Sequence, residues 1–156
     1  MTTDPPSLKG RALRLLSAQE YSRAELQRKL ARFEETPGSL AGVLDELQTK
    51  GFISEQRVLE SVVHRRAAKL GALRICQELQ HKGLDAEAVS EAVAALKITE
   101  LQRAQAVWEK KFGVMAEDAR EMAKQVRYLA ARGFDGDVIR RVVACKDGDQ
   151  DMDDVL

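Results

Sequence analysis

The side chains of this sequence whose types and spacing could do chemistry are mainly basic. Arg120, Lys124 and Arg127 are separated by four and three residues, so one outward helix face would carry all three. Clustered Lys and Arg side chains pair with phosphate groups or acidic protein surfaces. The residues that we expect to contact such an anionic partner are Arg28, Arg32, Arg65, Arg66, Lys69, Arg74, Lys110, Lys111, Lys124, Arg127, Arg132, Arg140 and Arg141. For any single residue, a solvated face of mixed charge is the alternative.

Groups suited to catalysis or metal binding are scarce. The two histidines, His64 and His81, lie in no metal-ligand spacing, and the two cysteines, Cys76 and Cys145, form no CxxC pair. The sequence contains neither GxxxxGK[ST] nor GxGxxG, so no phosphate-binding loop is indicated. We therefore expect no catalytic residue, no metal site, no cofactor and no enzymatic activity.

Two further side chains have both a structural and a functional interpretation. Cys76 lies on an apolar helix face with Ile75 and Leu79, which favours inert packing over a catalytic role. Trp108 could anchor a partner. The flanking residues Val107 and Phe112 favour instead a place in a core between repeats.

The net charge of zero combines two oppositely charged parts of the chain. Residues 147–156 (DGDQDMDDVL) hold five Asp and no Lys or Arg, whereas residues 1–146 hold 25 basic and 20 acidic residues, a net charge of +5. The composition of 147–156 indicates a disordered, solubilising tail. The alternative is an internal competitor that shields the basic clusters from weakly bound anions.

Composition narrows the class of protein. With 44% hydrophobic residues the chain can bury a core. The sequence contains no apolar run of about 18 residues, so no membrane span is predicted. The first ten residues contain no apolar segment typical of a signal peptide. The unpaired cysteine pattern favours a reduced, cytoplasmic chain. Few aromatics and prolines, with many Ala, Leu, Glu and Arg residues, favour helix.

Helices are expected to carry the basic clusters. The apolar periodicity predicts nine of them. Ser22 and Glu25 have the spacing of a capping box at a helix start. Gly71 is expected to end the fourth helix, and Thr99 to begin the seventh.

The nine helices fall into three groups of three with a recurring register. Apolar residues recur at intervals of 49 and 50 residues in all three helices of each group: Leu13, Val62 and Phe112; Leu30, Leu79 and Leu129; and the pairs Val43-Leu44, Ala92-Val93 and Val142-Val143. We therefore predict an all-α fold of three tandem three-helix repeats, resembling helix-turn-helix units, in an elongated or curved array. The expected segments are a lead (1–7), three repeats (8–53, 54–98 and 99–146) and the acidic tail (147–156).

Sequence-specific DNA binding by these helix-turn-helix-like units is disfavoured. In that mode the last helix of each unit would enter a DNA groove. The corresponding segments 40–50 and 85–97 each contain a single basic residue, at Lys50 and Lys97, and segment 135–146 contains Arg140, Arg141 and Lys146. Taken together, these helices offer few donors for an operator contact.

Several motifs, in order, resemble one known family. The segments are YSRAELQRKL (21–30), GFISEQR (51–57), GALRICQELQHKG (71–83), KKF (110–112) and RYLAARGF (127–134). Together they are similar to the RecX regulatory proteins over about residues 8–145. The second segment departs from the family pattern, which usually has an acidic pair before the arginine, so a partner contact made by that pair would be weaker here.

The resemblance implies a non-enzymatic modulator, mostly an inhibitor, of the RecA recombinase. Such proteins bind RecA and its filament on single-stranded DNA and block strand exchange, ATP hydrolysis and filament growth. The expected partners are thus RecA and its DNA filament, with weak direct DNA contact, and the expected state is a monomer. Two alternatives stay open: a direct DNA-binding helical protein that acts without RecA, and a plain helical scaffold for another protein.

Overall fold

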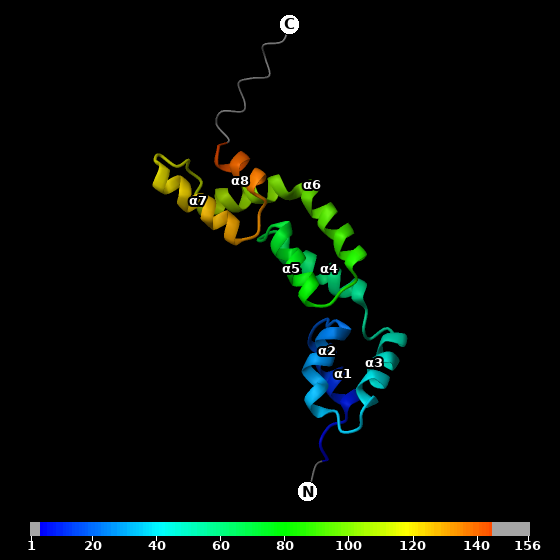
Figure 1. The fold of residues 1–156 in the computed structure, drawn as a ribbon. Coiled ribbons are helices and arrows are strands. Elements are labelled where there is room, and N and C mark those ends of the chain that lie inside the picture. Colours follow the sequence, from blue (N-terminus) through cyan, green and yellow to red (C-terminus); the bar gives the residue numbers. More distant parts are fainter. Residues whose placement is uncertain (1–3, 145–156) are drawn as a thin grey trace. The chain divides into compact units, whose positions relative to one another are not determined.

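The computed structural model describes residues 4–144, and the regular secondary structure in that range is entirely helical (Figure 1). The elements are α1 (Leu8–Ala18), α2 (Arg23–Leu30), the 3-10 helix η1 (Ala31–Phe33), α3 (Ser39–Thr49), α4 (Glu55–Arg66), α5 (Ala72–His81), α6 (Ala86–Lys111), α7 (Ala119–Ala131) and α8 (Gly136–Val143). The all-α prediction is confirmed. The predicted acidic tail and Cys145 lie outside the described residues. No helix among those described is long and apolar enough to cross a membrane.

The chain forms two compact units, and each unit combines two stretches of sequence. Unit 1 comprises Met1–Val62 with Leu79–Val89, and unit 2 comprises Val63–Glu78 with Ser90–Leu156. Helices α4, α5 and α6 therefore contribute residues to both units.

Unit 1 has its main core among the first three α-helices. Its buried members are Ala12, Tyr21, Leu26, Leu30, Leu40, Leu44, Leu47 and Ile53. The predicted capping box is present at the start of α2: the Glu25 N–H donates to Ser22 Oγ at 3.1 Å, and the Ser22 N–H donates to Glu25 Oε1 at 3.0 Å. This reciprocal cap satisfies two backbone donors that would otherwise lack partners.

The end of α5 is attached to α2 through side chains. Ser22 Oγ donates to the Lys82 carbonyl at 2.6 Å, and Lys82 Nζ lies 3.0 Å from Glu25 Oε2. Arg28 donates to the His81 carbonyl at 2.9 Å. Burial opposes ionisation of Glu25, but the Ser22 N–H and the Lys82 ammonium together hold the pKa of Glu25 below its ordinary value. We call this set of contacts the α2–α5 junction.

Unit 2 has its core in α6, α7 and α8. The buried members are Ala104, Leu129, Phe134, Ile139, Val142 and Val143. Trp108 packs against this core, and its Nε1 donates to Gln125 Oε1 at 3.0 Å. The core role predicted for Trp108 is therefore right, but the residues around it belong to the third group of helices and not to an interface between groups.

The start of α5 is attached to the end of α7 through backbone. The Gly71 N–H donates to the Arg132 carbonyl at 2.8 Å, and the Leu73 N–H donates to the Gly133 carbonyl at 3.2 Å. Arg74 Nη1 donates to the Ala131 carbonyl at 2.8 Å. We call this set of contacts the α5–α7 junction.

The role predicted for Gly71 is wrong. Helix α4 ends at Arg66, and Gly71 instead precedes α5. A Cβ atom at Gly71 would collide with the Gly133 carbonyl. The glycine is therefore required by the close approach of two backbone segments, a constraint that cannot be seen in local sequence.

The helix break predicted at Thr99 is also wrong, because α6 continues without interruption for 26 residues. No Gly or Pro lies between Ala86 and Lys111, and Thr99 Oγ1 donates to the Leu96 carbonyl at 3.4 Å instead of capping a new helix. The described residues consequently form eight α-helices and one 3-10 helix, where nine helices were predicted.

Two charged side chains of α6 bind the segment that joins α4 to α5. Glu100 is buried, and its Oε1 accepts the Ala72 N–H at 2.9 Å. Arg103 Nη1 donates to the carbonyls of Ala67 and Leu70, both at 2.8 Å. Burial lowers the pKa of Arg103, and the Glu100 charge partly offsets that effect. These bonds satisfy backbone groups at two helix ends.

Candidate anion-binding surfaces

Four of the predicted partner-binding cations bond within the chain: Arg28, Arg66, Arg74 and Arg140. Arg28 and Arg74 belong to the two junctions described above. Arg66 Nε lies 3.2 Å from Glu78 Oε2, and Arg140 pairs with Asp137. The main role that the structure gives Arg28 and Arg74 is therefore to join helices, and a partner would have to compete for Arg66 and Arg140.

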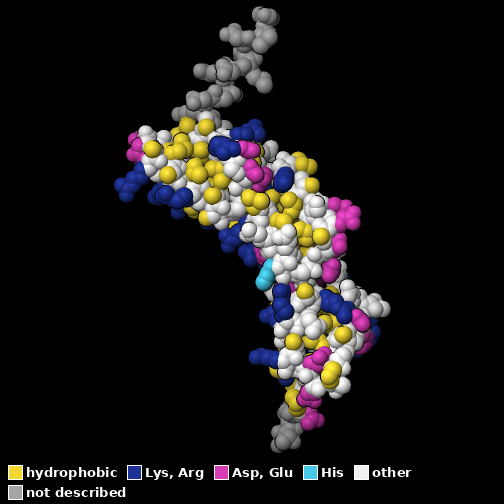
Figure 2. Space-filling view, in the orientation of Figure 1, with side chains coloured by type: hydrophobic (Ala, Val, Ile, Leu, Met, Phe, Trp, Pro, Cys, Tyr) yellow, Lys and Arg dark blue, Asp and Glu magenta, His cyan; other side chains and the backbone are white. Residues whose placement is uncertain are grey.

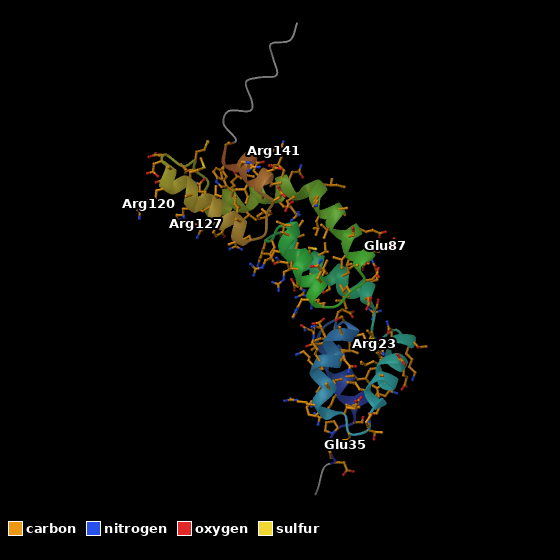
Figure 3. All side chains as sticks on the ribbon, in the orientation of Figure 1. Arg23, Glu35, Glu87, Arg120, Arg127 and Arg141 are labelled. Atoms are coloured by element: carbon orange, nitrogen blue, oxygen red, sulfur yellow. The ribbon has the colours of Figure 1, made fainter. Side chains whose placement is uncertain are left out.

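Most of the other predicted cations are exposed: Arg32, Arg65, Lys69, Lys110, Lys111, Lys124, Arg127 and Arg141. Figure 2 shows Lys and Arg side chains gathered over α7. Arg120 and Arg127 extend away from that helix (Figure 3), as the sequence spacing predicted. The structure thus leaves a substantial part of the predicted basic set accessible to an anionic partner.

Unit 1 contains a basic hollow beside η1, which we call the Phe33 hollow. It measures about 280 Å³ and is lined by Pro6, Arg11, Arg14, Leu15, Lys29, Leu30, Arg32 and Phe33. The guanidinium of Arg11 lies 3.7 Å from the Phe33 ring centroid, and that of Arg32 lies 4.6 Å from it. An aromatic ring is therefore flanked by two cations at cation–π distance.

Unit 2 contains a larger hollow with the same combination of side chains, which we call the Tyr128 hollow. It measures about 540 Å³ and is lined by Ala68, Lys69, Ala106, Val107, Lys110, Lys111, Tyr128 and Arg132. The Lys111 ammonium lies 5.3 Å from the Tyr128 ring centroid, and the Arg132 guanidinium lies 4.4 Å from it. The edge of Phe112 supports that ring at a centroid distance of 5.4 Å and an interplanar angle of 82°.

Helix ends place the cations of the Tyr128 hollow. Lys110 and Lys111 are the last two residues of α6, which Gly113 closes in the left-handed conformation at φ 66°. Arg132 follows the last residue of α7. Cations are favoured at helix C-termini, where the backbone carbonyls carry partial negative charge. The neighbouring residue Leu129 is fully buried, and Tyr128 packs against the core cluster to which Leu129 belongs.

The electrostatics of the Tyr128 hollow favour an anion. Lys69, Lys110, Lys111 and Arg132 have no ion-pair partner among the described residues of unit 2. Arg132 Nε is buried and makes no hydrogen bond within the described part of the chain. Four cations without carboxylate partners around one hollow give it a positive potential that an anionic ligand would neutralise.

Sequence reasoning missed part of both hollows. Arg11, Arg14 and Lys29 were not among the predicted binding residues, and neither Phe33 nor Tyr128 was considered as a ligand contact. The available signal was the repeat register, because Arg11 and Lys110 occupy equivalent positions 99 residues apart. Only the folded structure shows that these cations surround an aromatic ring.

The described residues offer little for other kinds of chemistry. Among residues 4–144 no group of three His, Cys, Asp or Glu side chains could hold a metal ion. Cys76 is a free, half-buried cysteine. The arrangement that stands out chemically is therefore the pairing of cations with an aromatic ring in each unit.

Comparison with protein families gives matches along almost the whole chain. Models described as the first, second and third three-helix domains of RecX match residues 9–52, 54–93 and 99–143. The predicted fold of three tandem three-helix repeats is therefore confirmed.

Comparison with individual proteins gives the same family name. Regulatory protein RecX of Leptothrix cholodnii is 51% identical over 147 residues, covering 94% of both chains. Regulatory protein RecX of Herminiimonas arsenicoxydans is 46% identical over 145 residues, covering 93% of this chain and 96% of that one. The crystal structure of RecX from Lactobacillus salivarius matches with a TM-score of 0.73 at 20% identity, covering 90% of this chain and 94% of that one. At that identity the structural match shows the fold alone.

Proposed function

Because this chain belongs to the RecX family of regulatory proteins, we propose that it binds the RecA filament on single-stranded DNA and lowers RecA activity. The activities affected are ATP hydrolysis, strand exchange and filament growth in DNA repair and recombination. The relatives are named as regulatory proteins, and the family is not one of enzymes. The protein therefore acts by binding and catalyses no reaction of its own.

The observation that carries this proposal is the match of all three RecX domains in order. The accessible cations support it, because a nucleoprotein filament exposes DNA phosphates that Lys and Arg side chains neutralise. Contacts spread over several repeats give affinity through multivalency and need no deep pocket.

The test is the rate of ATP hydrolysis by RecA on single-stranded DNA while this protein is titrated in. We expect the rate to fall with increasing protein, and the protein to co-sediment with RecA filaments. An unchanged rate at micromolar protein, together with no co-sedimentation, would contradict the proposal. Binding to DNA alone, with RecA unaffected, would favour the alternative of a DNA-binding protein that acts without RecA.

A charge-reversal pair identifies which cations matter for this activity. The variant Lys110→Glu with Lys111→Glu should weaken inhibition of RecA about tenfold or more, because the loss of each phosphate contact lowers affinity. The matched control is Lys50→Glu with Lys97→Glu, which makes the same charge change at two exposed residues outside both hollows and outside the predicted basic clusters. Equal losses in the two variants would show that total charge matters and that position does not.

A further inference from the structure

The two basic hollows occupy equivalent positions in the first and third repeats. The register that aligns Leu30 with Leu129 is 99 residues. In that register three lining residues correspond pairwise: Arg11 with Lys110, Lys29 with Tyr128, and Phe33 with Arg132. In the last two pairs the first repeat has the cation before the ring, and the third repeat has the ring before the cation. The combination of ring and cations is therefore retained although the individual residues differ.

The middle repeat lacks this combination. The second repeat follows the first by 49 residues. In this register Glu60 corresponds to Arg11 and Glu78 to Lys29. Lys82 corresponds to Phe33. Glu78 pairs with Arg66, and Lys82 with Glu25, so both side chains serve internal contacts. The ring with flanking cations is thus a feature of the terminal repeats and not a by-product of the repeat itself.

The chemistry of the hollows fits one nucleotide better than an acidic peptide. Lys and Arg side chains would neutralise a phosphate, and either anion could use them. An aromatic ring stacked with a guanidinium offers a flat surface as well, and the faces of unpaired bases stack on such surfaces. An acidic peptide side chain has no flat ring to place there. The bases of a duplex are paired and stacked, which leaves single strands as the better ligand.

We propose that the Phe33 hollow and the Tyr128 hollow each bind one nucleotide of single-stranded DNA, with the phosphate on the cations and the base against the ring–guanidinium stack. The middle repeat makes no equivalent contact. This inference rests on the proposed function in that it assigns to the two terminal repeats the contact with the DNA strand of the filament.

The experiment measures binding of a fluorescently labelled oligodeoxythymidylate by anisotropy, without RecA and at low salt. Tyr128→Ala should weaken binding about tenfold, and Tyr128→Phe, which keeps the ring, should stay within about twofold of the unmodified protein. Lys29→Glu with Arg32→Glu in the first repeat should weaken it by a similar factor. The control Lys50→Glu with Lys97→Glu should lose less than about threefold. Thermal unfolding monitored by circular dichroism establishes that each variant is folded.

A second strand tests the role of the base. A labelled strand of the same length with abasic sites should bind the unmodified protein less tightly than oligodeoxythymidylate does, and Tyr128→Ala should abolish that difference. Ultraviolet cross-linking to a strand that carries iododeoxyuridine should label a peptide containing Tyr128. These two results report contact at the ring, which a general attraction between charges would not produce.

Several outcomes would overturn the inference. Equal losses in the hollow variants and the control would show nonspecific attraction, and equal competition by polyglutamate of matched charge would show an acidic-peptide site. Because these measurements omit RecA, inhibition of RecA without DNA binding at the hollows would refute this inference and leave the proposed function intact. DNA binding at the hollows without any effect on RecA would refute the proposed function and leave this inference intact.

Discussion

The two junctions, α2–α5 in unit 1 and α5–α7 in unit 2, use equivalent positions but different chemistry. Gly83 and Gly133 lie 50 residues apart, both with positive φ, and each contacts the second helix of the preceding repeat. A Cβ at Gly83 would lie 2.8 Å from the Cβ of Ala24, whereas a Cβ at Gly133 would collide with the backbone of Arg74. Unit 1 completes its junction with side-chain hydrogen bonds and an ion pair. Unit 2 uses two backbone hydrogen bonds and one side-chain hydrogen bond, from Arg74.

The same repeat-to-repeat contact therefore differs between the two units in its sensitivity to pH and to added side-chain atoms. The backbone hydrogen bonds of the α5–α7 junction carry no titratable group, and Arg74 stays charged and binds a neutral carbonyl there, so this junction should depend little on pH. The Glu25–Lys82 pair gives the α2–α5 junction a titratable component. An added side-chain atom should cost more at the α5–α7 junction than at the α2–α5 junction, because the backbones approach more closely there and leave less room.

The largest expected effect comes from Gly133→Ala, which would disrupt the α5–α7 junction. The alanine would adopt φ 86° and collide with Arg74, so we expect unit 2 to lose about 3 kcal/mol of unfolding free energy. Trp108 is the single tryptophan and lies in unit 2, so its fluorescence during urea unfolding reports this unit.

Gly113→Ala is the matched control for this substitution. Gly113 also has positive φ, but a Cβ there would meet the Glu109 carbonyl at 3.1 Å, where no second helix is involved. Its cost should be about 1 kcal/mol. Equal costs for the two variants would mean that the junction adds nothing to the backbone strain.

Loss of the Glu100 cap should be the next largest effect on unit 2. Glu100→Ala leaves the buried Ala72 N–H without its acceptor and should cost about 2 kcal/mol, measured by the same Trp108 fluorescence. The exposed residue Glu109 provides the control, and Glu109→Ala should change stability by less than about 0.5 kcal/mol. A cost for Glu100→Ala no greater than that of its control would contradict the capping role.

Ser22→Ala should have a smaller effect, confined to unit 1. The substitution removes the helix cap of α2 and the hydrogen bond to the Lys82 carbonyl, with an expected cost of about 1 kcal/mol. Amide hydrogen exchange is the suitable measurement, because it reports each helix separately. Protection should fall in α2 and at the end of α5, while α7 and α8 keep theirs. A uniform loss across both units would contradict this assignment.

The smallest effect is the acid dependence of the α2–α5 junction. The lowered pKa of Glu25 means that its contribution to stability is present above the ordinary carboxyl pKa of 4.5 and is lost as pH falls through the lowered value. Glu25→Gln should therefore destabilise the protein at about pH 6, and the difference from the unmodified protein should shrink at about pH 3. Thermal unfolding at both pH values measures this, and a difference that grows in acid would contradict the sign.

The sequence predicted those features that depend on local patterns. The Ser22–Glu25 spacing correctly identified a capping box, and the register of Leu30, Leu79 and Leu129 correctly identified three repeats. The first signal comes from residues close in sequence and the second from simple periodicity. Both can be recognised without knowledge of tertiary contacts.

Features that depend on tertiary contacts could not be predicted in this way. Gly71 resembles a helix stop in sequence, and only the approach of Gly133 explains its position. The basic clusters were predicted as a group, but Arg28 and Arg74 proved to join helices, whereas Arg11 was omitted from the group. Charge alone does not say whether an arginine faces a carbonyl of its own chain or a ligand.

The continuity of α6 restricts how this chain can change in length. One residue inserted after Lys97 would turn every later residue of the helix by about 100° relative to the residues before it. Glu100 would then leave the Ala72 N–H, and Arg103 would leave the carbonyls of Ala67 and Leu70. The boundary between the second and third repeats therefore does not tolerate a change in the length of α6. A chimera that takes its third repeat from a relative must keep the number of α6 residues that precede Glu100 and Arg103.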